Sequence, residues 1–473
     1  MTERLSARAF LTLVADDSTF TELPYPARDS KPDGPLAWQG YDASRARAAE
    51  RTGEHESVVC GTASVAGTRV VLIAFEFGFL GGSLGERTGD RLEAAYTHAR
   101  THRLPVVPLV ATGGSRMQEG MLALTQLQRV ARQSALTREA GLPQIAALRD
   151  PTTGGGWATL GAGADVILAL PDAQVGFAGS RVRPPDADPA AYRAEAQVTA
   201  GAADAVVPPT ELRETLGRWL RLLTGGKATP ARSPTTPEGL APAPVPAALG
   251  TVDLPGTGWD AVRRARSVER PRAASYLDAY FTHRAAINGD RCGGADPDGM
   301  LCGFGERDGR TVAYAAQTGT ATRPAGYRTA ARLIRLADRL RIPVLTLVDT
   351  PGAANDAEAE RQGAGAAIAD LFGAVAAART PITTLLIGEG GSGGALALAA
   401  SGNTWATPDS YFSVIAPELA AAILKRPADQ VEATADQLRI RPQDLVDLGV
   451  IRGIVGPEPE PEPDSPAHPR GEA

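Results

Sequence analysis

Residues 103–116 read RLPVVPLVATGGSR, and residues 341–353 read RIPVLTLVDTPGA. In each stretch a proline is followed by five mostly apolar residues and then by a turn that contains glycine. A continuous apolar run of this length is typical of a strand buried on both faces of a sheet. Because Arg103 and Arg341 lie 238 residues apart, the two stretches indicate one design used twice.

A second pair of stretches supports the duplication. Residues 142–162 (LPQIAALRDPTTGGGWATLGA) and 380–400 (TPITTLLIGEGGSGGALALAA) repeat a strand, a glycine-rich turn and an alanine-rich helix at the same spacing of 238 residues. Residues 116–139 and 326–341 place apolar side chains three and four positions apart, which predicts amphipathic helices. Alternating strands and helices predict an α/β fold, here in two related copies.

The composition suggests where the two copies begin and end. Residues 225–258 are rich in Pro, Ala, Gly and Thr, which is typical of a linker, and residues 457–473 (PEPEPEPDSPAHPRGEA) read as a disordered acidic tail. We therefore expect domains at residues 1–224 and 259–456.

Charge and cysteine content exclude several kinds of partner. Lys plus Arg total 48 against 54 Asp plus Glu, a net charge of -6, which favours neither nucleic acid nor an anionic membrane. Cys60, Cys292 and Cys302 are scattered, so neither a disulfide framework nor a zinc site is expected. With no long apolar run and no signal peptide, we expect a cytoplasmic protein.

The glycine-rich turns at residues 151–156 and 388–395 are the first candidate sites. The first N–H groups of a helix lack partners within the helix, and the helix dipole is positive there, so these groups stabilise an oxyanion. The alternative is that glycine only supplies a positive φ angle. No GxxxxGK[ST] motif occurs, and GEGGSGGA at residues 388–395 has the GxGxxG spacing without the further features of a dinucleotide-binding unit, so a nucleotide cofactor is discounted. The residues around Ser392 do not form the context of a hydrolase's nucleophile elbow.

Side chains suited to catalysis are few. His98 and His102 have the spacing of metal ligands but no third ligand, so a solvated helix end is the favoured interpretation. Glu119 is either a general base or a residue that compensates the helix dipole. Arg116 and Arg328 lie beside glycine turns and meet either a phosphate or a neighbouring carboxylate.

Longer motifs resemble a known family. The first half resembles the beta subunit of the carboxyltransferase of bacterial biotin-dependent acetyl-CoA carboxylase through FGFLGGSLGE, TGGSRMQEG and DPTTGGG. The second half resembles its alpha subunit through RPAGYRTAARLIRLAD, DTPGA and GEGGSGGALALA. The resemblance covers nearly the whole chain and implies two fused crotonase-like (ClpP/crotonase) domains.

The resemblance also implies a reaction that needs few acid or base side chains. Carboxybiotin releases CO2, the freed ureido nitrogen takes the α-proton of the acyl-CoA, and the enolate attacks CO2. The expected product is malonyl-CoA from acetyl-CoA, or methylmalonyl-CoA from propionyl-CoA. The protein supplies two oxyanion holes.

By motif position, the resemblance assigns Gly154 and Gly155 to the acyl thioester and Gly394 and Ala395 to biotin. The other residues expected to bind substrate or cofactor are Gly81, Gly82 and Ser83 along CoA, Gly113, Gly114, Gly352 and Ala353 at strand ends, Gly393, Ala397, Arg116 and Arg328.

Departures from the family define the expected partners. The four-cysteine zinc ribbon of the beta subunit is missing, so zinc is not expected, and Ala354-Asn355-Asp356 replaces a glycine-rich continuation after DTPGA. A biotinylation site and an ATP-binding carboxylase are missing, so a biotin carboxyl carrier protein and a biotin carboxylase are expected as separate chains. In the family the site forms across subunits, which implies a homodimer or larger oligomer. The alternatives are a decarboxylase or transcarboxylase that runs the same chemistry in reverse, and a non-catalytic scaffold of a carboxylase complex.

Overall fold

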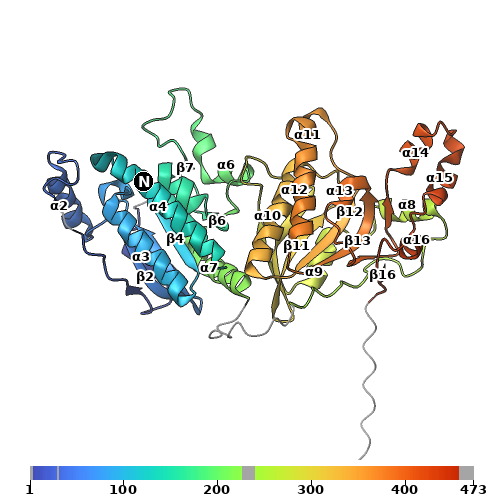
Figure 1. Ribbon diagram of the computed structural model, residues 1–473, viewed down its shortest axis with the longest axis horizontal. Coiled ribbons are helices and arrows are strands. Elements are labelled where there is room, and N and C mark those ends of the chain that lie inside the picture. The colour runs from blue at the N-terminus through green and yellow to red at the C-terminus, as the bar shows by residue number, and fades with distance from the viewer. Residues whose placement is uncertain (1–3, 29–30, 226–239, 458–473) are drawn as a thin grey trace, which may run out of the picture.

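A computed structural model describes residues 4–28, 31–225 and 240–457 of the 473-residue chain. Figure 1 shows two similar halves side by side, each built on one sheet. All but the first residue of the tail predicted for residues 457–473, and residues 226–239 of the predicted linker, lie outside the described residues.

The first sheet has the order β1-β2-β3-β4-β5-β6-β8, and β7 pairs with β5. Strands β2 and β3 form an antiparallel hairpin, and β3, β4, β5, β6 and β8 run parallel. The bounds are β1 Thr21–Glu22, β2 Val58–Val65, β3 Thr68–Phe75, β4 Val106–Thr112, β5 Ile145–Thr153, β6 Val166–Ala169, β7 Val175–Gly176 and β8 Ala205–Val206.

The second sheet has the equivalent order β9-β10-β11-β12-β13-β14-β16, and β15 pairs with β13. The bounds are β9 His283–Ile287, β10 Met300–Arg307, β11 Arg310–Gln317, β12 Val344–Thr350, β13 Ile382–Gly391, β14 Thr404–Ala406, β15 Tyr411–Ser413 and β16 Gly453–Ile454. The predicted α/β fold with two crotonase-like copies is confirmed. The predicted strands are central ones, since every residue of β4 and of β12 is buried.

Helices cover the sheets on the faces that the apolar patterns predict. In the first half these are α1 Ala7–Val14, α2 Tyr41–Thr52, α3 Glu86–His102, α4 Gly120–Glu139, α5 Gly154–Gly156, α6 Ala194–Thr199 and α7 Pro209–Thr224. In the second half they are α8 Gly258–Arg266, α9 Ala273–Tyr280, α10 Pro324–Leu340, α11 Ala357–Arg361, α12 Ala364–Ala377, α13 Ser392–Leu396, α14 Pro417–Ile423, α15 Val431–Gln437 and α16 Pro442–Asp447. Helices α4 and α10 confirm the two predicted amphipathic helices, except that a 3-10 turn, η2 Met117–Glu119, precedes α4.

Short irregular helices complete the chain: η1 Leu80–Gly82, the π-helical turn η3 Trp157–Gly161, η4 Pro189–Tyr192 and η5 Ala428–Gln430. Residues 240–257 form neither helix nor strand, but Ala243 and Ala248 are buried there. Backbone carbonyls of this segment accept hydrogen bonds from Tyr280 and Thr383 of the second half. None of the helices in the described ranges is long and apolar enough to cross a membrane.

The two halves join through packing and through buried charge. Trp219 of α7 packs edge-on against Phe304 of β10, with ring centroids 6.3 Å apart. The fully buried carboxylate of Asp204, in the first half, pairs with Arg291 and Arg332 of the second half. Burial alone would raise the pKa of Asp204, but the two guanidinium groups hold it below its ordinary value. Loss of one partner from such a buried pair costs about 3–5 kcal/mol, so this contact fixes how the halves meet.

Candidate active site

Each sheet ends, at the carboxyl edge of its parallel strands, in a pair of facing turns. In the first half these are residues 113–115 after β4 and the start of α5 after β5; in the second half they are residues 351–353 after β12 and the start of α13 after β13. We call them the first turn pair and the second turn pair. In both halves the pairing register between the two strands shifts just before the turns, so the regular strand pairing is interrupted at equivalent places.

A threonine at the end of the inner strand shapes both turn pairs. The Oγ1 of Thr112 accepts a hydrogen bond from the backbone N–H of Gly114 at 3.0 Å, and Thr350 accepts one from Gly352 at 3.1 Å. Both glycines have a φ angle that other residues rarely adopt, +109° and +139°. The N–H groups of Gly114 and Gly352 are therefore occupied, and these two predicted residues shape the site without donating to a ligand.

The facing turns approach each other more closely than side chains permit. A Cβ on Gly154 would lie 3.1 Å from the Cα of Gly114, and a Cβ on Gly394 would lie 2.5 Å from the nitrogen of Ala353. Gly154 has a φ of +63°, and the equivalent residue, Ser392, has +57°. Glycine is therefore favoured at Gly154 by conformation and contact and required at Gly394 by contact, while the short side chain of Ser392 is tolerated at the second-half position equivalent to Gly154.

Several predicted amides of the first half already have partners. Gly154 donates its N–H to the carbonyl of Phe177 at 3.0 Å, and Gly113 donates to Gly81 at 2.9 Å. Gly155 and Gly156 follow in the first turn of α5, where N–H groups have no partner within a helix. The predicted residue Gly155 is thus placed to donate, and Gly156 is a donor that motif position did not indicate.

The second half has candidate N–H donors at the corresponding positions. Gly393 and Gly394 lie in the first turn of α13, and nothing stands within 4 Å of the Cβ position of Gly393. Ala395 is the fourth residue of this helix, where helical geometry turns the N–H toward the carbonyl of Gly391. The structure thus moves the candidate donors one residue upstream of the predicted pair Gly394 and Ala395.

In each turn pair, an isolated β-bridge orients one further backbone N–H group. Leu84 pairs with Ser115, and Thr322 pairs with Ala353, in isolated parallel β-bridges. The hydrogen bonds of each bridge are made by the sequence neighbours of Ser115 and Ala353, not by the N–H groups of these two residues. The N–H groups of Ser115 and Ala353 consequently point away from the bridge, toward α5 and α13. Ala353 was predicted, whereas Ser115 was not, because only the bridge shows which way its amide faces.

The predicted CoA-lining residues lie beside the first turn pair. Gly81 and Gly82 belong to η1, and a Cβ on Gly82 would lie 2.1 Å from the carbonyl oxygen of Ala111, so η1 lies directly over the end of β4. Ser83 follows, and its hydroxyl accepts a hydrogen bond from Arg116 at 3.2 Å.

The side chain of Arg116 faces inward. It is fully buried and forms an ion pair with Glu56, also fully buried. Burial alone would raise the pKa of Glu56, but the Arg116 guanidinium lowers it to about 2. Glu119 accepts hydrogen bonds from the Tyr41 hydroxyl at 2.5 Å and from the Glu86 backbone at 2.6 Å. A phosphate cannot reach Arg116 without breaking this cluster, so Arg116 meets a neighbouring carboxylate, which was one of its two predicted alternatives. Glu119 is held by Tyr41 and by the start of α3, and we assign it a structural role.

The other predicted side chains also lie away from the turns. The guanidinium of Arg328 donates hydrogen bonds to the carboxylate of Asp290 at 2.7 Å and to the backbone carbonyl of Gln362 at 3.0 Å. Ala397 is fully buried in the apolar core behind α13. His98 and His102 stack in the last turn of α3, as the helix-end interpretation predicts. In the described ranges no three His, Cys, Asp or Glu residues gather as metal ligands.

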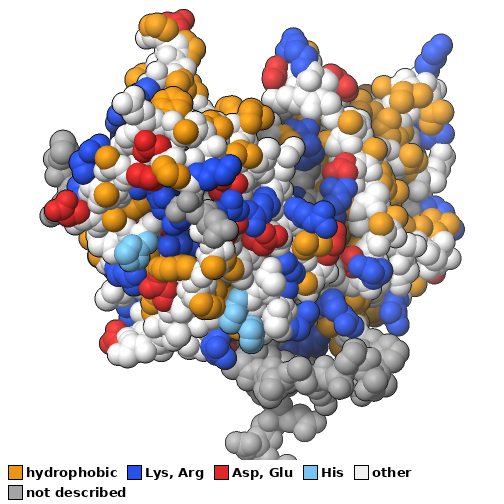
Figure 2. All heavy atoms as spheres, turned by 60° about the vertical axis from the view of Figure 1, so that its left-hand side comes forward, with side chains coloured by type: hydrophobic (Ala, Val, Ile, Leu, Met, Phe, Trp, Pro, Cys, Tyr) orange, Lys and Arg blue, Asp and Glu red, His pale blue; other side chains and the backbone are white. Residues whose placement is uncertain are grey.

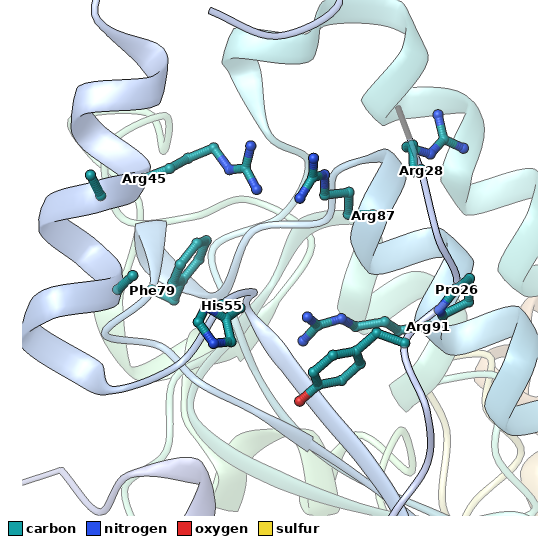
Figure 3. Close-up of a pocket in the computed structure, with 10 residues that line it drawn as sticks. Pro26, Arg28, Arg45, His55, Phe79, Arg87 and Arg91 are labelled. Atoms are coloured by element: carbon teal, nitrogen blue, oxygen red, sulfur yellow. The ribbon is translucent and has the colours of Figure 1, made fainter. Parts of the chain in front are cut away.

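A basic cavity of about 380 Å³ lies next to η1 and was not predicted (Figure 3). It is lined by Tyr25, Pro26, Arg28, Arg45, Ala46, Ala49, His55, Phe79, Arg87 and Arg91. Arg28 is held by Asp90 and Glu86, and Arg91 lies 3.4 Å above the Tyr25 ring. Arg87 has no ion pair or hydrogen bond with the described residues, and Figure 3 shows Arg45 and Arg87 extending toward each other. The sequence signal for this cavity is weak because its arginines come from three separate segments.

Exposed apolar side chains surround both turn pairs. Near the first pair they are Met117, Met121, Leu124, Phe177 and Val182; near the second they are Leu396, Val414, Leu419, Ile423 and Leu424. Figure 2 shows apolar side chains gathered along the upper edge of the molecule in that view. Apolar groups at this density are typical of a surface that another molecule covers.

Two equivalent domains, each ending in such a turn pair, together with matches to two carboxyltransferase family models, place the chain in the class of carboxyltransferases. Residues 255–470 match the family model for acetyl co-enzyme A carboxylase carboxyltransferase-like proteins, and residues 37–184 match the carboxyl transferase domain. The chain belongs to the acetyl-CoA carboxylase carboxyl transferase family, with the beta and alpha parts in one polypeptide, and is the carboxyltransferase of a biotin-dependent acyl-CoA carboxylase.

The chain is similar to individual relatives over most of their length. The chain is 39% identical to the acetyl-coenzyme A carboxylase carboxyl transferase subunits beta/alpha of Salinispora arenicola, covering 97% of this chain and 83% of that protein. It is 34% identical to the probable biotin-dependent acyl-coenzyme A carboxylase beta3 subunit of Mycobacterium bovis, covering 91% and 86%. Among solved structures, transcarboxylase 12S with methylmalonyl-coenzyme A bound superimposes with a TM-score of 0.77 at 20% identity, over 96% of this chain and 87% of that one. This last likeness concerns the fold alone.

Proposed function

We propose that the first turn pair binds the thioester of an acyl-CoA and that the second turn pair binds the ureido group of biotin on a separate carrier protein. The observation that carries the proposal is the pair of equivalent N–H clusters, Ser115 with Gly155 and Gly156, and Ala353 with Gly393 and Gly394. A thioester and a ureido group each present one carbonyl oxygen that gains negative charge during the reaction. Both need donors that are already oriented.

The chain's own contribution is electrostatic. The first cluster holds the thioester oxygen and stabilises the enolate that forms when the α-proton leaves, at about 3 kcal/mol per well-placed donor. When bound, carboxybiotin supplies CO2 and then a ureido nitrogen that accepts the α-proton. The second cluster orients that ureido group and leaves the nitrogen free. No acid or base side chain of the protein is required, which agrees with the buried, ion-paired state of Glu119 and Arg116.

The segment that departs from the family after the second turn pair is compatible with biotin. Asp356 caps helix α11 by accepting hydrogen bonds from Glu358 and Ala359, each at 2.9 Å. The backbone N–H of Ala354 donates a hydrogen bond to the backbone carbonyl of Thr322 at 2.9 Å. The altered residues therefore form a regular helix start and leave the Ala353 amide in place, which weighs against a non-catalytic scaffold.

The direct test is reconstitution. Purified protein mixed with biotin carboxylase, biotinylated carrier, ATP and bicarbonate should convert acetyl-CoA or propionyl-CoA into malonyl-CoA or methylmalonyl-CoA. The variant Gly394→Val should lower turnover about 100-fold or more, because its side chain would displace the Ala353 amide, while acyl-CoA binding stays measurable by calorimetry.

Gly373→Val is the matched control, since that glycine lies on the exposed side of α12 with nothing within 4 Å of its Cβ position. Full activity of Gly394→Val would refute the role of the second turn pair. No carboxylated product from any short acyl-CoA, with active partners, would refute the enzyme itself.

The basic cavity beside η1 is suited to the phosphates of CoA. Its unpaired Arg87 and the neighbouring Arg45 provide positive charge, and Phe79 and Tyr25 provide aromatic surface next to the CoA-lining residues Gly81 to Ser83. Arginine binds phosphate through charge-assisted hydrogen bonds. The cavity would thus hold one end of CoA while η1 guides the thioester to the first turn pair.

Removal of one charge tests this placement. Arg87→Ala should raise the KM for acyl-CoA about tenfold with kcat within twofold, because a charge-assisted hydrogen bond to the bound ligand is lost. The increase should shrink at high salt. Arg132→Ala, on the exposed face of α4 in the same half, should leave KM unchanged. An unchanged KM for Arg87→Ala would place the phosphates elsewhere.

The exposed apolar side chains around both turn pairs suggest that a second copy covers them. The two turn pairs lie in different halves of the chain, and the family resemblance implies a site formed across subunits, so we infer that a facing copy brings the two ligands together. Sedimentation at assay concentration should give at least a homodimer. A fully active monomer would contradict this arrangement.

A further inference from the structure

Three polar side chains lie fully buried behind the second turn pair: Gln317 at the end of β11, Thr322, and Tyr327 in α10. We call them the polar triad. The Nε2 of Gln317 donates to the backbone carbonyl of Gly394 at 3.1 Å and lies 3.4 Å from the Thr322 hydroxyl. The triad thus touches the same residue whose N–H group is a candidate donor to biotin.

Gln317 holds the glycine-rich turn at the start of α13 from the interior of the protein. Residues 390–394 read GGSGG, and glycine has more backbone freedom than any other residue. Because the peptide unit is planar, holding the Gly394 carbonyl from the inside fixes the peptide that joins Gly394 to Ala395. This contact restricts rotation about the backbone of Gly394 and so restrains the first turn of α13, in which the N–H groups of Gly393 and Gly394 lie, as a preorganised oxyanion site requires.

The hydroxyl of Tyr327 lies at the point where the facing turns meet. From the position that a Cβ of Gly394 would occupy, the hydroxyl is 2.6 Å away and the Ala353 nitrogen 2.5 Å away. Within the part of the chain that the structure describes, neither this hydroxyl nor the Oε1 of Gln317 has a hydrogen-bond partner. Burial raises the pKa of Tyr327, and the nearby Thr322 only partly offsets the rise, so the phenol stays protonated.

Two unpaired polar atoms at one buried place are costly for stability. The first half shows that the fold does not need them. By strand register and bridge, the counterparts of Gln317 and Thr322 are Phe75 and Leu84, and Gly89 occupies the position of Tyr327 in the equivalent helix. The three positions of the triad therefore carry no polar side chain in the first half, and the triad belongs to the second turn pair alone.

We propose that Gln317 and Tyr327 are positioning residues of the carboxyl-transfer reaction. Gln317 holds the Gly394 carbonyl by a hydrogen bond, and the Tyr327 hydroxyl packs where Gly394 meets Ala353, so that the N–H groups of Gly394 and Ala353 meet the ureido oxygen of biotin. The proposal rests on the assignment of the second turn pair to biotin. The polar triad distinguishes the two turn pairs: a side chain of the triad holds the Gly394 carbonyl in the second, whereas the buried cluster of Arg116 and Glu56 beside the first holds Ser83.

The test uses the full chain in the reconstituted transfer assay. Tyr327→Phe removes one oxygen atom and should lower kcat at least tenfold, with the KM for acyl-CoA within twofold of wild type. Its melting temperature should be equal or higher, because an unpaired buried hydroxyl is removed. Gln317→Met, which keeps the length but not the donor, should show the same division between kcat and KM.

Tyr96→Phe is the matched control, since Tyr96 is a buried tyrosine of the equivalent first-half helix, α3, with its hydroxyl directed at Gln144. It should leave kcat and KM unchanged. Unchanged kcat in Tyr327→Phe would overturn the proposal, as would a fall in kcat accompanied by a lower melting temperature or by a matching rise in KM. Those results would mean that the hydroxyl has no role or only a structural one.

Failure of this inference can be separated from failure of the proposed function. If Gly394→Val keeps full activity, the second turn pair does not serve biotin, and both fail together. If Gly394→Val is inactive while Tyr327→Phe and Gln317→Met are as active as wild type, biotin still binds there and only the positioning role is refuted.

Discussion

The structure depends on backbone meeting backbone at the carboxyl edge of each sheet. Gly154 against Gly114, and Gly394 against Ala353, bring two turns closer than any side chain would allow. This contact leaves N–H groups without partners within the protein. A fold usually avoids such groups because unpaired buried donors are costly. Here Gly393 is exposed, Ser115 and Ala353 are partly exposed, and Gly155, Gly156 and Gly394 are buried, so an oxygen of a substrate that enters between the turns would supply the missing acceptor.

Duplication explains why one chain can hold two ligands of different chemistry. The strands, the Thr-to-Gly hydrogen bonds and the bridged residues recur in both halves. The surroundings then diverge. The first half adds a basic cavity beside η1, which suits a phosphate-bearing ligand, and the second half adds a polar triad behind its turn. Buried charge at Asp204 holds the two halves in one arrangement.

Much of this could be predicted from the sequence, because apolar runs, glycine turns and a spacing of 238 residues are local signals. The central strands, α4 and α10, and the glycines at the site all follow from them. Donor direction could not be predicted, since it depends on tertiary bridges: Ser115 and Gly156 were missed, and Gly114 and Gly352 are engaged by threonines. Arg116 was left open between a phosphate and a neighbouring carboxylate, because the sequence does not show that distant Glu56 reaches it.

A crystal structure with an acyl-CoA and biotin bound together would show whether each turn pair binds its own ligand. The thioester oxygen should lie about 3 Å from the N–H groups of Ser115 and Gly155 or Gly156 in one copy. The ureido oxygen should lie at a similar distance from Ala353 and Gly393 or Gly394 of the facing copy. Both ligands against the same half, or biotin on the first turn pair, would contradict the account.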